Sequence, residues 1–113
     1  MIKIYHNNRC SKSRCGLQIL EDSGKDFEII KYLEDSPSET ELKDIIELLG
    51  ITPIQLIRKG EAIWKDKYKG KDLSDAEIIT AMITYPKLIE RPIVINDDKA
   101  IIGRPPEAIL NII

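Results

Sequence analysis

The sequence has no long hydrophobic run and no excess of charge of one sign. Its longest apolar stretches are only a few residues, far below the roughly 18 needed to cross a bilayer. Its first residues, MIKIYHNN, lack the apolar core of a signal peptide. Basic residues number 17 and acidic residues 19, so general nucleic-acid binding is not favoured. We expect a cytoplasmic protein with no membrane and no nucleic-acid partner.

Cysteine and histidine are also scarce. The 113 residues include only Cys10, Cys15 and the single histidine His6 as soft metal ligands. Because a structural zinc site takes four ligands, these three residues do not predict a metal site. Cytosolic thiols are kept reduced, so two cysteines indicate redox chemistry or burial more often than a structural disulfide.

The N-terminal third predicts a strand, a helix and a second strand. The length suits a single domain over residues 1–113, and there are no repeats. Residues 2–5 alternate apolar and polar side chains, and a helical pattern runs from Ser11 to the stop signal at Ser23-Gly24. Residues 27–32 are rich in isoleucine and aromatic residues. This order predicts parallel strands with a right-handed crossover.

The middle of the chain, about residues 37–88, predicts a helical insertion. The capping-box pattern of Ser38 and Glu41 begins a helix that Gly50 ends. Thr52-Pro53 is typical of a second helix start, and we expect this helix to reach about Arg58.

The remainder of the insertion predicts a loop and one more helix. Residues 59–71 are polar and predict a loop with a short helical turn around Trp64. Ser74 and Glu77 repeat the capping-box pattern before an apolar helix, and Pro86 lies beyond it.

The C-terminal part returns to strands. Residues 92–95 and 100–102 flank the turn 96–99 and predict a β-hairpin. Residues 103–106 then lead into a last helix, whose apolar positions are Ile109, Leu110 and Ile113. The fold class is therefore α/β, with a β-α-β unit, a helical insertion and a β-β-α unit.

Cys10 is the candidate nucleophile. It lies where the first strand gives way to a helix, whose unpaired amides and positive dipole end would face its sulfur. Such surroundings lower a thiol pKa from about 8.5 to between about 3.5 and 7.5. The neighbours Arg9, Lys12 and Arg14 add positive charge, and Ser13 offers a hydroxyl donor.

Three arginines stand at predicted element boundaries: Arg58, Arg91 and Arg104. Taken singly, each is a surface charge. Taken together with Cys10, they predict a clamp for a phosphate-like dianion, because the planar guanidinium donates two parallel hydrogen bonds to oxyanions.

Four segments carry a family resemblance: YHNNRCSKSR at 5–14, IRKG at 57–60, ERPIV at 90–94 and IGRPPE at 102–107. In order and spacing, along essentially the whole chain, the sequence resembles the ArsC family of glutaredoxin-coupled arsenate reductases. The Spx and YffB-like proteins share its thioredoxin-like (glutaredoxin-like) fold. The resemblance implies that fold, and it implies that Pro92 is the cis-proline facing the active-site cysteine.

The resemblance also implies an activity. Cys10 would attack arsenate, while Arg58, Arg91 and Arg104 would bind the oxyanion. The nearby positions His6, Ser13 and Arg14 match family positions around the cysteine. The partners implied are arsenate, glutathione as co-substrate and glutaredoxin, with no metal and no bound cofactor, and we expect a monomer.

Cys15 departs from the family pattern and leaves two readings open. It is either a thiol that resolves an oxidised Cys10 or a packed core cysteine. Residues five apart in one regular helix have Cα atoms roughly 8 to 9 Å apart, beyond the limit of about 7 Å for a disulfide. The core reading is therefore the default expectation.

Two other functions fit the same scaffold. Spx-like regulators bind RNA polymerase, but they carry Cys-x-x-Cys and usually lack an arginine at the position of Arg104. This chain has four residues between Cys10 and Cys15, which favours the enzyme. A glutathione-dependent thiol-disulfide reductase stays an alternative, because an arginine-lined pocket could equally hold a carboxylate.

Overall fold

The strands of this computed structural model, which describes residues 1–113, all lie in one of two units. The sheet unit comprises residues 1–35 and 91–113, and the helical unit comprises residues 36–90. The helical unit has nearly the bounds of the insertion that the sequence predicts at about 37–88.

The sheet unit contains four strands in the order β2-β1-β3-β4. Their bounds are Ile2–Tyr5 for β1, Phe27–Ile30 for β2, Ile93–Asn96 for β3 and Lys99–Ile102 for β4. Strand β1 pairs parallel with β2 and antiparallel with β3, and β3 forms an antiparallel hairpin with β4. The predicted parallel β-α-β unit and the predicted hairpin are therefore both present.

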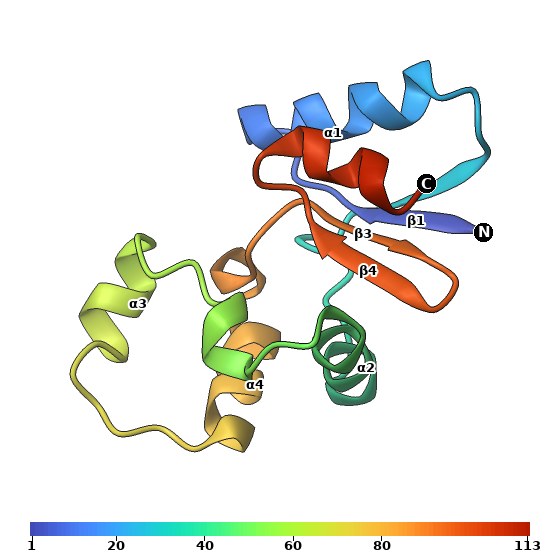
Figure 1. Ribbon diagram of the computed structural model, residues 1–113. Helices are drawn as coiled ribbons and strands as arrows, with labels where there is room; N and C mark the ends of the chain where they lie inside the picture. Colours follow the sequence, from blue (N-terminus) through green and yellow to red (C-terminus); the bar gives the residue numbers. More distant parts are fainter. The chain divides into compact units, whose positions relative to one another are not determined.

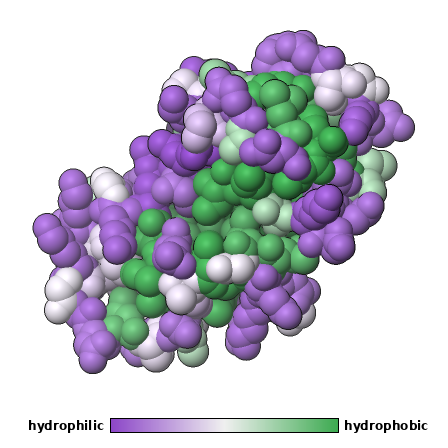
Figure 2. All heavy atoms as spheres, viewed as in Figure 1, coloured by the Kyte–Doolittle hydropathy of each residue, from purple (hydrophilic) through white to green (hydrophobic).

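Two helical segments cover one face of this sheet, as Figure 1 shows. Helix α1 (Ser11–Asp22) connects β1 to β2, and the 3-10 helix η3 (Pro106–Asn111) follows β4 and packs against α1. The buried core between helices and sheet consists of Ile2, Ile4, Leu20, Val94 and Ile109. Figure 2 shows hydrophobic residues at the surface over η3, where Leu110 is 58% exposed.

Two glycines allow α1 and the end of β4 to pack closely against Pro92, just before β3. A Cβ atom on Gly16 would lie 2.9 Å from Cδ1 of Ile109 and 3.0 Å from Cγ of Pro92. On the other side, a Cβ on Gly103 would lie 2.9 Å from the same proline carbon. Only glycine fits at both positions without displacement of Pro92 or Ile109.

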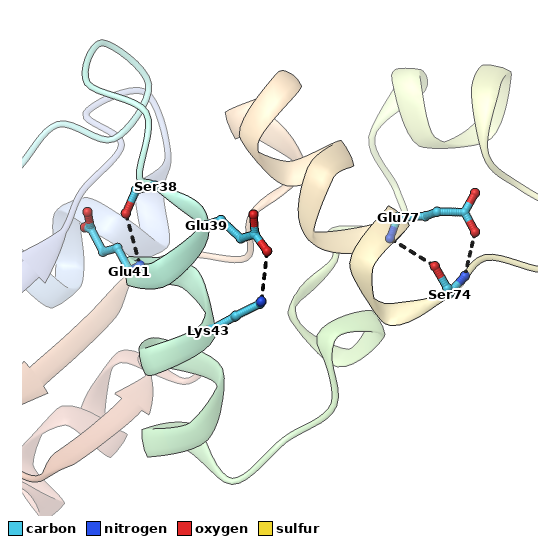
Figure 3. Close-up of polar contacts among 6 residues, drawn as sticks. All are labelled: Ser38, Glu39, Glu41, Lys43, Ser74 and Glu77. Carbon is cyan, nitrogen blue, oxygen red and sulfur yellow. Dashed lines mark hydrogen bonds and ion pairs between the residues drawn. The ribbon is translucent and has the colours of Figure 1, made fainter.

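The helical unit consists of short helices joined by turns. Their bounds are Glu39–Leu49 for α2, Pro53–Leu56 for η1, Ala62–Lys67 for α3, Asp75–Thr84 for α4 and Pro86–Leu88 for η2. Both predicted caps form: Ser38 Oγ accepts the amide of Glu41 at 3.1 Å, and Ser74 with Glu77 makes a complete capping box (Figure 3). The buried apolar side chains of α2 and α4 are Leu42, Ile45, Ile46, Ile78, Ile79, Ala81 and Met82.

Three predicted boundaries are wrong. The helix expected to reach Arg58 is the 3-10 turn η1, which ends at Leu56 because Ile57 forms a β-bridge with Ile89. The second strand ends at Ile30 rather than residue 32, since Lys31 opens a hydrogen-bonded turn.

The last helix is of the 3-10 type and ends at Asn111, so Ile113 lies outside it. None of the helices is long and apolar enough to span a bilayer.

Candidate active site

Cys10 is the N-cap of α1 and lies at the tip of a tight turn. Its backbone is extended, with φ −99° and ψ 124°, while the helix begins at Ser11. The amide of Cys10 donates to the carbonyl of Asn7 at 3.1 Å, and its own carbonyl accepts the amide of Arg14 at 3.0 Å. This backbone geometry leaves the side chain half-buried, beside the unpaired amides of the first helical turn.

The surroundings of Cys10 favour its thiolate. Burial raises the pKa of this thiol. The opposing effects are larger in sum: they come from the amide of Ser13, the charge of Arg91, the amide of Lys12 and a hydrogen bond from Arg91. The resulting pKa lies below the ordinary value of a cysteine. A lowered pKa increases the fraction of nucleophilic thiolate at neutral pH.

Ser13 connects the helix to the loop that precedes Cys10. Its side chain is fully buried, at 0% exposure. Its Oγ accepts the backbone amide of Asn7 at 2.9 Å and lies 2.7 Å from Nδ1 of His6. His6 and Ser13, which the sequence predicted as supporting residues, therefore lie beside the turn that carries Cys10. Their hydrogen bond links the start of this turn to helix α1.

Arg14 has a comparable structural contact. Its Nη1 donates to the carbonyl of Asn8 at 3.0 Å, across the turn. The amide of Arg9 donates to Oδ1 of Asn7 at 3.0 Å. Together with the Ser13 contacts, these bonds order the whole segment from His6 to Cys10.

Two of the three predicted arginines lie near Cys10: Arg91 contacts Cys10, and Arg104 contacts Arg91. Arg91 is only 4% exposed, and its guanidinium both hydrogen-bonds and stabilises the Cys10 thiolate. Nη1 of Arg104 donates to the carbonyl of Arg91 at 3.3 Å. The Arg91–Pro92 peptide bond is cis, in agreement with the prediction for Pro92.

Arg58 belongs to the helical unit, where its Nη1 pairs with Oε2 of Glu61 at 3.3 Å. Its amide donates to the carbonyl of Leu88 at 2.7 Å, which orders the backbone at this position. A role for Arg58 beside Cys10 stays a prediction.

The expectation that Cys15 lies in the core is wrong. The default reading placed it in the core, but its side chain is exposed, since the core-facing positions of α1 are Ser13, Gly16 and Leu20. Both cysteines are free thiols. No group of three His, Cys, Asp or Glu side chains comes together as a metal site.

A hollow of about 330 Å³ was not anticipated from the sequence. It is lined by residues 6–9 and by Lys31, Leu33 and Glu34. One signal was available: both lining segments directly follow strands of the predicted parallel β-α-β unit, whose carboxyl ends meet at one edge of a sheet.

These features define a class of protein. A mixed four-stranded sheet with a cysteine at the N-terminus of the first helix, and a cis-proline before β3, is a thioredoxin-like fold with a candidate thiol site. Buried guanidinium and helix amides beside a thiolate can receive an oxyanion and stabilise charge as it is displaced.

The chain belongs to the ArsC family, whose model matches residues 5–112. It is 46% identical to the arsenate reductase of Haemophilus influenzae, over 97% of each chain. It is 43% identical to the protein YfgD of Escherichia coli K12, over 99% of this chain and 96% of that one. Its fold matches the solved structure of arsenate reductase from Vibrio cholerae with a TM-score of 0.94 at 46% identity, over 99% of this chain and 97% of that chain.

Proposed function

We propose that this protein is a cytoplasmic arsenate reductase that uses glutathione, with glutaredoxin, as its reductant. The observation that carries the proposal is the position of Cys10 at the N-terminus of α1, where the Ser13 amide and the buried Arg91 guanidinium lower the pKa of its thiol. The names of the relatives above support the choice of arsenate as oxyanion.

The first step is covalent catalysis. The Cys10 thiolate attacks arsenic(V), a sulfur–arsenic bond forms, and one oxygen leaves as water after it takes up protons. Arg91 stabilises the thiolate before attack and the negative oxygens afterwards, and Arg104, whose guanidinium reaches the Arg91 carbonyl, extends the positive surface. Arg58 completes the proposed clamp.

The electrons come from glutathione. Two glutathione thiols are oxidised to one disulfide, arsenic is reduced from the pentavalent to the trivalent state, and the overall reaction releases one water. Glutaredoxin takes part in the release of arsenite and returns Cys10 to the thiolate. Cys15, five residues along α1 and exposed, is not needed for this cycle.

The test is arsenate-dependent glutathione oxidation by the purified protein, with and without glutaredoxin. Cys10→Ser should abolish turnover, whereas Cys15→Ser should retain it. Arg91→Ala should lower kcat by about a hundredfold or more, the usual effect of losing one stabilising donor.

Two results would contradict the proposal. Turnover of small disulfides without any turnover of arsenate would favour the thiol-disulfide reductase. Stable binding to the RNA polymerase α subunit, again without arsenate turnover, would favour the regulator.

A further inference from the structure

The hollow beside the Cys10 turn has no part in holding the oxyanion in the proposal above. We propose that this hollow binds the charged ends of the peptide thiol that reduces the enzyme, a molecule with two carboxylates and one ammonium. This inference rests on the proposed function and names the place where its co-substrate, glutathione, binds.

The location follows from the sheet. The amide of His6 donates to the carbonyl of Ile30 at 3.0 Å, so the parallel pairing of β1 and β2 continues one residue beyond β1. Residues 6–9 and residues 31–34 therefore leave the sheet side by side. Clefts outside the carboxyl ends of neighbouring parallel strands are where α/β proteins bind small molecules.

Both walls of the hollow are ordered by hydrogen bonds. The amides of Glu34 and Asp35 each donate to the carbonyl of Lys31 at 3.0 Å, which closes a turn and orders the backbone at both Lys31 and Glu34. The opposite wall is the segment from His6 to Arg9, which the buried Ser13 hydroxyl and the Asn7 side chain hold. Preformed walls lower the entropy cost of binding.

The charges match a zwitterion rather than a simple anion. Arg9 and Lys31 supply two cations for two carboxylates, and Glu34 supplies one carboxylate for an ammonium. Lys31 and His6 both line the hollow, and the Lys31 charge lowers the pKa of His6. Arsenate has neither an ammonium group nor separated carboxylates, and it would leave Glu34 without a role.

The size of the hollow and its place beside the Cys10 turn also fit. A volume of about 330 Å³ lies at the lower end of the range of about 300–1,000 Å³ for small-molecule sites. One wall of the hollow ends at Arg9, the residue before Cys10. The hollow therefore borders the turn that carries Cys10.

The kinetic test uses two lysines at opposite ends of one strand. Lys31 follows β2 and lines the hollow, whereas Lys25 precedes β2; both lysines are exposed. Lys31→Gln should raise the KM for glutathione about three- to tenfold, and Glu34→Gln should raise it as well. Both should leave kcat at saturating glutathione and the KM for arsenate unchanged. The control Lys25→Gln should match the wild type in every parameter.

Two thiol analogues show whether the effect is recognition of charge. With 2-mercaptoethanol, which carries no charged group, Lys31→Gln and the wild type should react at the same rate. The glycine ethyl ester of glutathione lacks the glycine carboxylate. If Lys31 holds that carboxylate, the wild type and Lys31→Gln should have the same KM for this ester. The proposal would be overturned if Lys25→Gln raised the KM for glutathione as much as Lys31→Gln does. It would also be overturned if Lys31→Gln slowed the reaction with 2-mercaptoethanol as much as that with glutathione.

A binding measurement separates this inference from the proposed function. S-methylglutathione cannot be oxidised, so its binding to the reduced protein needs neither arsenate nor turnover. Backbone amide NMR shifts should move at residues 6–9 and 31–34 in the wild type and move much less in Lys31→Gln. Binding there without arsenate turnover would overturn only the choice of arsenate. Arsenate turnover with no shifts at these residues up to saturating concentration would overturn only the hollow.

Discussion

The hydroxyl of Ser13 lies 2.7 Å from Nδ1 of His6, and both side chains are buried. The same oxygen accepts the amide of Asn7 at 2.9 Å. A single buried hydroxyl thus joins the imidazole to the loop that precedes Cys10.

His6 should titrate below the ordinary pKa of histidine. Burial lowers its pKa, a hydrogen bond with the Ser13 backbone raises it, and the charges of Arg14 and Lys31 lower it again. Since His6 is the only histidine, its imidazole resonance can be followed by NMR without assignment. Lys31→Gln should move the midpoint upward and Lys25→Gln should not. A midpoint at or above about 6.5 would contradict the placement of His6 among these charges.

The charge of Arg91 should be visible in the ionisation of Cys10. Arg91→Met removes the charge but keeps a side chain of similar length, so the pKa of Cys10 should rise toward its ordinary value. Arg91→Lys keeps the charge and should show a smaller rise. Thiolate absorbance near 240 nm, taken as the difference from Cys10→Ser, measures both. Identical titration curves for wild type and Arg91→Met would show that this guanidinium does not stabilise the thiolate.

The same lowered pKa makes stability depend on pH. The folded protein releases the Cys10 proton at lower pH than the unfolded chain, whose thiol titrates near about 8.5. The extra stability is therefore fully present above the unfolded pKa and is lost as pH falls through the folded pKa. Urea unfolding of wild type and Cys10→Ser in reducing buffer should give free energies whose difference grows with pH and then levels off. A difference independent of pH would mean that folding leaves this thiol's pKa unchanged.

Gly16→Ala should destabilise the sheet unit. The new methyl group would lie 2.9 Å from Ile109 and 3.0 Å from the Pro92 ring, and overpacking of this kind costs about 1–3 kcal/mol. The gain in helix propensity, about 1 kcal/mol, offsets part of this cost. Thermal unfolding should show a lower Tm.

Gly60→Ala is the matched control, because no atom lies within 4 Å of its Cβ position and its φ is not positive. Its Tm should be unchanged or slightly higher. An equally stable Gly16→Ala variant would show that Pro92 and Ile109 move without cost.

Local patterns predicted most of the fold. The N-caps Ser38 and Ser74, and the turn between β3 and β4, depend on residues a few positions apart, and all are present in the structure. One error comes from a contact between residues distant in sequence. Ile57 leaves a helical path because Ile89 pairs with it, and the Thr52-Pro53 motif contains no information on residue 89.

In the candidate site too, local features were predicted from the sequence and features that depend on distant contacts were not. The position of Cys10 at the start of α1 follows from the local sequence, and the pairing of its sulfur with Arg91 agrees with the family resemblance. The exposure of Cys15 did not follow, because the face of α1 that packs inward depends on where η3 and Pro92 lie. The position of Lys31 beside His6 was missed, because the sequence predicted that the second strand continues to residue 32 and so includes Lys31.

The glycines on either side of Pro92 limit where this protein can vary. Any side chain larger than hydrogen at residue 16 or 103 would collide with Pro92, which directly follows Arg91, and with Ile109. New specificity for the oxidant or the reductant therefore has to arise by substitution in the turn before Cys10 and in the turn after β2. A library that randomises those two turns and keeps both glycines is the rational starting point for redesign.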